Sequence, residues 1–477
     1  MKYLLARYSL LVLGLLPLGP ARAQKAPAPR RARPTGVSSW LTTPDQTQAL
    51  KPQPAQAWGK VVPPGTALIE VNDRQRFQTM DGFGYCLTGG SAELLHAMSA
   101  PARANLLREL FGRGPQDIGV SYLRISIGAS DLDAAVFSYD DQPAGQTDPT
   151  LAHFSLAPDE KHLIPVLKEV LAINPRLELL GSPWSPPAWM KTNEATKGGS
   201  LKPEYYGAYA QYIVKYLQGM QAQGITITAI TPQNEPLHPG NNPSLLLPAE
   251  AEAAFIGQHL GPAIKAAGLK TKIICYDHNA DKPEYPLTVL GNAQANPYVD
   301  GSAFHLYAGP ISALSQVHDA YPQKNVYFTE QWTGSRSTFA DNLGWHVKNL
   351  EIGAPRNWAK AVLEWNLAAD PQQNPHTPGG CDQCLGALTL APGDAVTRNV
   401  AYYTVAHASK FVPTGSVRIG STSEGVLPNV AYRTPSGDHV LLVQNDQPTP
   451  QTFSIRADNS RTATATLPAG AVATYVW

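Results

Sequence analysis

Two glutamates, Glu235 and Glu330, stand where the chain could carry out acid–base or nucleophilic chemistry. Glu235 lies between two prolines in TPQNEPLH (231–238), and Glu330 lies in FTEQW (328–332); each follows an apolar run. A charge at the end of a buried strand is unfavourable unless it is paired or has a task. Two carboxylates that face each other can cleave a glycosidic bond, because one protonates the departing oxygen while the other attacks the anomeric carbon or activates water. We expect Glu235 to be the proton donor, with a pKa raised by burial and nearby negative charge.

Polar and aromatic residues follow other apolar runs and could bind a sugar. Aromatic faces stack on sugar rings, and polar side chains bond to hydroxyl groups. Structural roles are open for each: the tryptophans could pack in the core, His305 could be an internal barrel histidine, and Arg124 could pair with Glu330. Asp277 could cap a helix, and a metal site of Asp277, His278 and Asp281 is the less favoured interpretation. The candidate substrate-binding residues are Arg124, Asp131, Trp184, Asn234, His305, Tyr307 and Trp365.

The elements that must position these residues alternate between short β-rich runs and helical patterns. Helical periodicity is visible at 162–173, 204–220 and 251–268. This alternation predicts an α/β fold, a (β/α)8 TIM barrel. A doubly wound open sheet is the competing topology, but no glycine-rich phosphate loop follows the first strand. The eight expected strands are 82–84, 120–128, 177–185, 227–235, 272–279, 301–307, 325–332 and 361–368.

In such a barrel the chemistry lies at the carboxyl ends of the strands. Glu235 ends the fourth expected strand and Glu330 the seventh. These two ends face each other across the mouth of a closed barrel. We therefore expect the two carboxylates to form one site.

Other segments flank the barrel, which we place at 80–401. Residues 402–477 alternate with turn residues and lack helical periodicity, which predicts an appended antiparallel β-sandwich domain. Strand-like residues at 59–79 are expected to join this sandwich. Residues 24–58 are rich in Pro and Ala and are expected to form a disordered leader.

The first 23 residues have the pattern of a secretory signal peptide. Basic Lys2 and Arg7 precede an apolar stretch, and Ala-Arg-Ala ends at Ala23. A membrane anchor is the alternative, but the apolar stretch is short for a bilayer. The full chain has 37 basic and 37 acidic residues. Cleavage after Ala23 would remove three basic residues and no acidic ones, which leaves 34 basic and 37 acidic residues. We expect a secreted or periplasmic protein that does not insert stably in a membrane and has no nucleic-acid partner; the oligomeric state stays open.

The chain contains four cysteines. Cys381 and Cys384 could close a short disulfide loop in an exported protein, or form a redox-active or metal-binding pair. No second Cys or His pair stands at a zinc-finger spacing, so we favour the disulfide. Cys86 and Cys275 are expected to be buried thiols.

Several stretches, in consistent order over residues 80–421, resemble glycoside hydrolase family 30, the family of lysosomal glucosylceramidase and microbial endo-β-1,6-glucanases. They are MDGFGYCLTGGSAELL, LRISIGASDLD, LLGSPWSPPAWMKTN, TPQNEPLH, FHLY, FTEQW, EWNLAADPQQNPHTPGG and VAHASKFVPTGSVRIGS. The resemblance implies a barrel with a β-sandwich built from both chain ends, and a retaining mechanism. It implies no metal or organic cofactor.

Individual positions carry the resemblance further. Glu235 matches the family's acid/base and Glu330 its nucleophile, and Tyr307 matches a tyrosine near the nucleophile. Sugar contacts of the family match Asp131, Trp184, Asn234 and Trp365, and the Asp131–Trp184 pair favours glucose at the cleaved position.

The chain also departs from glucosylceramidase at the rim of the site. It has Leu306 where that enzyme has a tryptophan, and it has the Cys381–Cys384 loop, which makes ceramide less favoured as the aglycone.

The leading hypothesis is a secreted retaining hydrolase of β-glucosidic bonds, with a carbohydrate or glycolipid substrate. It would be either glucosylceramidase-like or an endo-β-1,6-glucanase. The alternatives are a xylanase, β-fucosidase or β-galactosidase of the same family. A barrel that binds carbohydrate without turnover is a further alternative, although such a protein would need neither glutamate.

Overall fold

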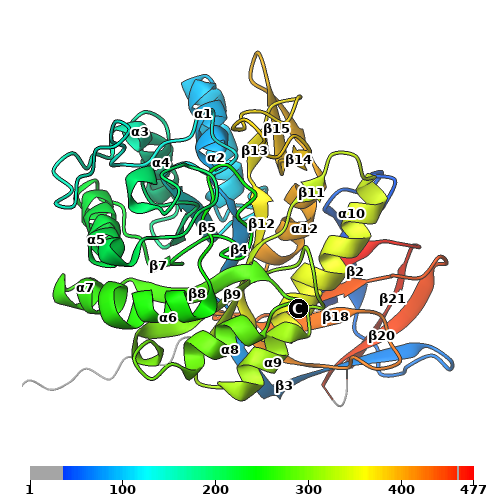
Figure 1. Cartoon of the computed structure of the whole chain (residues 1–477). Coiled ribbons are helices and arrows are strands. Elements are labelled where there is room, and N and C mark those ends of the chain that lie inside the picture. The colour runs from blue at the N-terminus through cyan, green and yellow to red at the C-terminus, as the bar shows by residue number, and fades with distance from the viewer. Residues whose placement is uncertain (1–35, 459–460) are drawn as a thin grey trace, which may run out of the picture. The chain divides into compact units, whose positions relative to one another are not determined.

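A computed structural model describes residues 36–458 and 461–477 (Figure 1). The expected signal peptide, residues 1–23, and the first part of the expected leader lie outside the described residues.

Eight parallel strands form a closed barrel, which confirms the expected topology. Around the barrel the order is β10-β12-β4-β5-β6-β7-β8-β9. All eight strands fall on the runs that the sequence predicts, although β7 is only two residues long. Their bounds are β4 Gly82–Cys86, β5 Tyr122–Ile127, β6 Glu178–Pro183, β7 Ala229–Ile230, β8 Lys272–Asn279, β9 Val299–His305, β10 Asn325–Glu330 and β12 Ala359–Asn366.

Helices connect the strands and cover the barrel (Figure 1). In α5, residues such as Tyr209, Tyr212, Tyr216 and Met220 are buried at helical spacing, so one face of the helix packs on the barrel. The α-helices are α1 Gly89–Ala97, α2 Ala100–Phe111, α3 Ala157–Glu160, α4 Leu163–Ile173, α5 Tyr206–Ala222, α6 Ala249–Phe255, α7 Gly261–Ala266, α8 Glu284–Gly291, α9 Ala313–Ala320, α10 Phe339–His346, α11 Ala354–Arg356 and α12 Val400–Ser409. Short 3₁₀ turns are η1 Ala188–Met190, η2 Pro203–Tyr205 and η4 Asn296–Tyr298, and π-helical turns are η3 Ile256–Leu260 and η5 Val347–Gly353.

The second part of the fold is an array of nine strands with its own core, the expected β-sandwich. Its order is β2-β1-β22-β19-β18-β17-β3-β20-β21, and all neighbours are antiparallel except β3 and β20. Ile69, Leu441, Phe453 and Tyr475 are among its buried core residues. The strands are β1 Gly36–Thr42, β2 Lys51–Ala57, β3 Ala67–Thr79, β17 Val417–Ser421, β18 Asn429–Arg433, β19 His439–Gln444, β20 Gln451–Asp458, β21 Arg461–Leu467 and β22 Val472–Val476.

The expectation of a disordered leader over 24–58 is wrong for residues 36–57. These residues form β1 and β2, and β1 pairs with the C-terminal strand β22. Val37 is fully buried, and the Trp40 ring lies 4.5 Å from that of Phe411. Composition misses this pairing because main-chain hydrogen bonds to a distant strand leave little trace in local residue types.

The expected barrel–sandwich boundary at 402 is also misplaced. Residues Val400–Ser409 form helix α12, which belongs to the barrel because the Tyr85 hydroxyl of β4 donates to the Ala401 carbonyl. The C-terminal strands of the sandwich begin only at Val417.

Two small sheets follow barrel strands β10 and β12. One pairs β11 Thr333–Gly334 with β14 Cys384–Leu385, and the other contains β13 Ala368–Ala369, β15 Leu388–Ala391 and β16 Ala395–Arg398. Within 36–458 and 461–477, no helix combines the length and apolarity needed to cross a bilayer.

We expect Val37→Asp to lower the free energy of unfolding by about 3 to 5 kcal/mol, because it buries an unpaired charge in the sandwich core. Ser38→Asp, on the exposed face of the same strand, is the matched control and should change stability little. Chemical denaturation of both variants measures the difference. Equal stability of the two would mean that β1 does not belong to the folded core.

Candidate active site

A pocket of about 260 Å³ lies at the carboxyl ends of the barrel strands. A larger cavity, of about 550 Å³, is lined by Glu178, Thr228 and Lys272 at the opposite, amino ends of β6 to β8. Only the smaller pocket contains a pair of facing carboxylates. It is lined by Asp131, Trp184, Glu235, His238, Asn241, His278, Asn279, Tyr307, Glu330, Trp332, Trp365, Cys381 and Cys384.

Glu235 and Glu330 lie together in this pocket, as the strand positions predict. One carboxylate oxygen of each lies within 4.8 Å of the other. Glu330 is the last residue of β10. Glu235 follows β7 in the left-handed region, at φ 45°, and its main-chain N–H donates to the Asp277 carbonyl at 3.0 Å. That hydrogen bond holds the Glu235 backbone against the end of β8.

Two donors bind the Glu330 carboxylate. Arg124 Nη1 donates to Oε2 at 2.6 Å, and the Tyr307 hydroxyl donates to Oε1 at 2.9 Å. Burial raises the pKa of Glu330 above its ordinary value, although the charges of His305 and Arg124 oppose that rise. The two donors fix the orientation of the carboxylate, so one face of Oε1 stays directed at the pocket.

Asp277, for which helix capping and metal binding were both left open, belongs to the network beneath the pocket. Instead of capping a helix, its fully buried carboxylate accepts hydrogen bonds from Arg124 Nη2 at 2.7 Å and His305 Nε2 at 3.1 Å. Thr231 and Thr329 hydroxyls donate to it as well. Its position at the end of β8, the same signal that identifies Glu235 and Glu330, would have pointed to it.

His305 lies between three carboxylates. Its Nδ1 is 3.1 Å from Glu235 Oε1 and 3.8 Å from Glu330 Oε1, and its Nε2 contacts Asp277. Burial alone would lower the pKa of His305, but the charges of Glu330, Asp277 and Glu235 raise it to about 9. His305 is therefore an imidazolium at neutral pH.

The pKa of Glu235 differs from the sequence-based expectation. Burial raises it, but the hydrogen bond and charge of His305 lower it more, so it lies below the ordinary value. The expectation of a raised pKa rested on burial and negative neighbours alone. In the structure the His305 cation contacts Glu235 directly and lowers that pKa.

The contacts of His305 with Glu235 and Glu330 also affect whether these residues could bind a metal ion. Glu235, His305 and Glu330 are close enough to share an ion. However, both nitrogens of His305 contact carboxylates, and Arg124 Nη1 donates to Glu330 at 2.6 Å, so protein groups already occupy the positions that an ion would take. Asp277, one residue of the less favoured metal interpretation, likewise bonds to Arg124, His305 and threonine hydroxyls.

Aromatic rings form one wall of the pocket. The Trp184 and Trp365 rings lie 5.5 Å apart, and the Arg124 guanidinium lies 4.8 Å from the Trp184 ring. This cation–π contact helps to keep the buried guanidinium in place. Asp131 also lines the pocket, and burial, followed by the charges of Glu330 and Glu235, raises its pKa to about 7.

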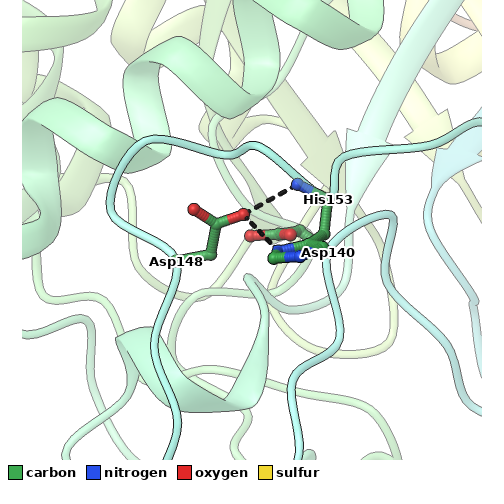
Figure 2. A group of neighbouring side chains, drawn as sticks. All are labelled: Asp140, Asp148 and His153. Atoms are coloured by element: carbon green, nitrogen blue, oxygen red, sulfur yellow. Dashed lines mark hydrogen bonds and ion pairs between the residues drawn. The ribbon is translucent and has the colours of Figure 1, made fainter.

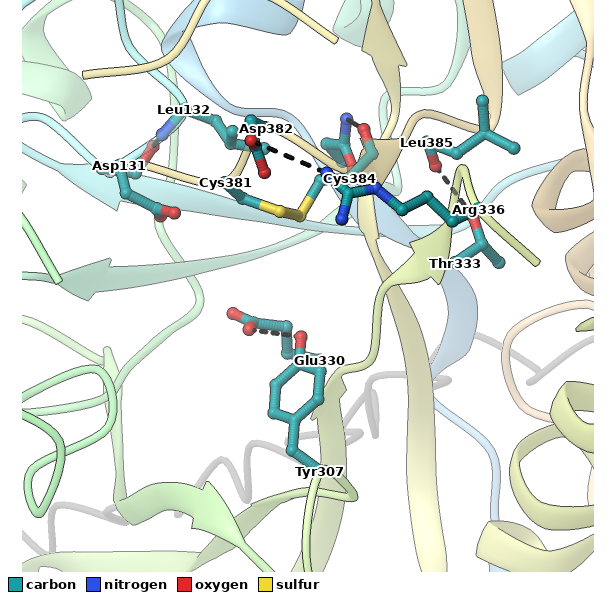
Figure 3. Close-up of a disulfide and its surroundings, with 12 residues drawn as sticks. Asp131, Leu132, Tyr307, Glu330, Thr333, Arg336, Cys381, Asp382, Cys384 and Leu385 are labelled. Carbon is teal, nitrogen blue, oxygen red and sulfur yellow. Dashed lines mark hydrogen bonds and ion pairs between the residues drawn. A yellow bond between two sulfur atoms is a disulfide. The ribbon is translucent and has the colours of Figure 1, made fainter. Parts of the chain in front are cut away.

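A disulfide joins Cys381 and Cys384, as favoured from the sequence, and both residues line the pocket (Figure 3). The bridge lies on the same side of Glu330 as Asp131 (Figure 3). Thr377, a few residues before it, donates its main-chain N–H to the Asp131 carbonyl at 2.9 Å. Cys86 and Cys275 are buried free thiols, as expected.

The structure brings all nine predicted site residues together, in two layers. Six line the pocket, whereas Arg124, Asn234 and His305 lie beneath it. Asn234 accepts from Arg124 Nη2 at 2.6 Å. Glu364, by contrast, turns away and bonds to His346. The pocket residues that prediction omitted are His238, Asn241, His278, Asn279 and Trp332; the Nδ1 of His278 is buried without a hydrogen-bond partner.

A parallel barrel with paired carboxylates and tryptophans at its mouth has the features of the glycoside hydrolases, and comparison with known proteins identifies this chain as one of them. It belongs to glycosyl hydrolase family 30: residues 80–412 match the family's TIM-barrel domain, and residues 415–475 match its beta sandwich domain.

The relatives are named either as endo-1,6-beta-glucanases or as glucosylceramidases. An endo-1,6-beta-D-glucanase of Neurospora crassa is 37% identical over 78% of this chain and 79% of the relative. The lysosomal acid glucosylceramidase of Mus musculus is 28% identical over 86% of this chain and 83% of the relative. Among solved structures, the endo-beta1,6-glucanase BT3312 superposes with a TM-score of 0.85 at 33% identity, covering 93% of this chain and 99% of that one.

We expect Asp277→Asn to lower the pKa of His305 below 9, because it removes one of the carboxylates that stabilise the imidazolium. NMR titration of the imidazole, assigned with His305→Gln, measures the pKa. Asp281→Asn, an exposed carboxylate four residues further along, is the control and should leave it unchanged. A neutral His305 at pH 7 in the unmodified protein would contradict this view of the charge network.

Proposed function

We propose that this protein is a secreted retaining endo-β-1,6-glucanase, with Glu330 as nucleophile and Glu235 as acid/base. The observation that carries the mechanism is the separation of the two carboxylates, with oxygens within 4.8 Å of each other. Retaining enzymes place their carboxyl groups about 5–5.5 Å apart, whereas inverting enzymes need about 6.5–9.5 Å for an intervening water.

In the first step, Glu330 attacks the anomeric carbon and the glycosidic C–O bond breaks. The donors on Glu330, Arg124 and Tyr307, aim its carboxylate without closing the face toward the pocket. The departing oxygen takes a proton from Glu235. Orientation of this kind supplies much of the rate, because the reacting atoms already stand in place.

His305 supplies the proton that Glu235 lacks in the free protein. The two groups are 3.1 Å apart, and a proton that moves from Nδ1 to Oε1 leaves a neutral imidazole and a protonated Glu235. As Glu330 becomes an ester, its negative charge disappears 3.8 Å from the imidazolium. The pKa of His305 then falls, so the proton is released toward Glu235 as the leaving group requires it.

In the second step, a water molecule replaces the leaving group. Glu235, now ionised, takes its proton, and the resulting hydroxide attacks the anomeric carbon while the bond to Glu330 breaks. Two inversions give net retention of the β configuration.

The sugar at the cleaved position is proposed to be glucose. Trp184 and Trp365 offer faces for stacking, and Asp131 and His278 offer polar atoms for hydroxyl groups. The aglycone is proposed from the relatives: a Neurospora crassa protein at 37% identity and a solved structure at 33% both bear the name of endo-1,6-β-glucanase, whereas the glucosylceramidase of Mus musculus stands at 28%. Secretion is proposed from the pattern of residues 1–23.

Removal of the two carboxylates should have different effects. We expect Glu235→Gln to lower kcat/KM, which reports the first step alone, by about 10²–10⁴-fold for an alkyl β-glucoside but far less for an aryl glucoside with a good leaving group, because such a leaving group needs no proton. Glu330→Gln should abolish both. Initial rates on the two substrates measure this, with Glu364→Gln as the control: it alters a buried carboxylate outside the pocket. Equal losses in Glu235→Gln on both substrates would contradict its role as proton donor.

On β-1,6-glucan we expect a ladder of oligosaccharides whose new reducing ends appear first as the β anomer. Proton NMR of early time points gives the anomer, and chromatography gives the product lengths. Aryl xyloside, galactoside and fucoside, together with glucosylceramide, form the comparison set. Initial α product would overturn retention; glucose as the sole product, or faster release from glucosylceramide, would overturn the endo-glucanase assignment but leave the mechanism in place.

A further inference from the structure

The loop between β5 and α3 gathers two aspartates and a histidine outside the pocket. Asp140, Asp148 and His153 turn their side chains toward one another (Figure 2). One oxygen or nitrogen atom of each lies within 4.8 Å of the other two. Asp148 Oδ2 accepts hydrogen bonds from the main-chain N–H of His153 at 2.8 Å and from its Nδ1 at 3.0 Å.

Asp140 contributes a buried oxygen that nothing in the described chain satisfies. Its side chain is almost fully buried, with 2% of the residue exposed. Gln142 donates to Oδ1 at 2.9 Å, but Oδ2 has no hydrogen-bond partner. Buried carboxylate oxygens are normally paired, because an unpaired one is costly.

A second negative charge stands beside it. One carboxylate oxygen of Asp148 lies within 4.8 Å of one carboxylate oxygen of Asp140. The nearby Trp189 indole donates to the main-chain oxygen of Asp140 and therefore does not relieve the carboxylate.

We propose that Asp140, Asp148 and His153 bind a divalent transition-metal ion of the zinc type. Two ligands about 2.1 Å from one tetrahedral ion are roughly 3.4 Å apart, and Asp148 Oδ2 and His153 Nδ1 already stand at 3.0 Å. The metal would replace the proton that Nδ1 now shares with Asp148. Imidazole disfavours calcium and magnesium, which take oxygen ligands.

A bound ion would stabilise the loop and would take no part in glycoside hydrolysis. His153 is the exposed partner, with 74% of its side chain accessible to solvent, whereas both carboxylates are buried. A bound ion would close the segment from 140 to 153 into a ring. Through the Trp189–Asp140 hydrogen bond, this ring supports η1, which follows Trp184 in the chain.

Isothermal titration of the full chain, first stripped of metal with a chelator, tests the proposal. We expect one equivalent of Zn²⁺ to bind and to raise the melting temperature, with no comparable effect of Ca²⁺ or Mg²⁺. His153→Ala should weaken binding at least about tenfold, the loss caused even by removing a hydrogen-bond partner of a metal ligand. Because the His153 side chain is exposed, its removal should leave folding intact, and weaker binding would reflect the loss of a ligand.

Asp140→Asn separates a metal site from a structural carboxylate. It should abolish the thermal shift by Zn²⁺ and, because it removes a buried carboxylate oxygen that has no hydrogen-bond partner, raise the melting temperature of the metal-free protein. Asp141→Asn, the exposed neighbour that bonds to Ser138, is the matched control and should keep the Zn²⁺ effect.

Three results would overturn the proposal. They are the absence of saturable Zn²⁺ binding, tighter binding of Ca²⁺ than of Zn²⁺, and Zn²⁺ binding that survives in His153→Ala but is lost in Glu330→Gln. The last result would assign the ion to the catalytic pocket.

Discussion

The site depends on one ion pair, between Arg124 and Asp277, that has no access to solvent. A buried guanidinium is tolerated only where carboxylates and other acceptors saturate it, and Arg124 is held by Asp277, Glu330 and Asn234 together. Asp277 in turn holds His305. The network therefore contains two cations and three carboxylates, and its excess of negative charge suits a sugar that develops positive charge at its anomeric carbon. Removal of either member of the central pair would leave an uncompensated charge under the pocket.

This arrangement requires a strained backbone at three residues near the ends of β7 and β8. Tyr276, Asp277 and Glu235 all adopt left-handed φ values, of 77°, 61° and 45°, although none is glycine. Such conformations cost of order 1–3 kcal/mol each and persist only where the surroundings enforce them. Here the hydrogen bond from the Glu235 N–H to the Asp277 carbonyl joins the strained segments directly. The short strand β7 is consistent with this, because the chain leaves the barrel early in order to turn Glu235 inward.

Sequence reasoning succeeded where local pattern and chemistry coincide. Each barrel strand is an apolar run, and its carboxyl end carries polar residues, so the pocket could be assembled from strand ends alone. It failed where the decisive partner is distant. β1 looks like a leader because its partner, β22, lies at the other end of the chain. The lowered pKa of Glu235 depends on a contact with His305, 70 residues away, that no local pattern encodes. The role of Asp277 stayed open because its partners come from other strands.

The pairing of β1 with β22 has a consequence for the order of folding. All eight barrel strands lie between these two in the sequence, so the barrel can form while the sandwich is still incomplete. The sandwich joins strands that are far apart in the sequence, since Ser38 of β1 pairs with Val476 of β22. Closing so long a loop costs about 2 kcal/mol more in conformational entropy than closing a loop a tenth as long. Without β22, the edge of β1 that faces it would have no partner strand. Completion of the sandwich thus requires that β1 and β22, 430 or more residues apart for each paired position, are both present.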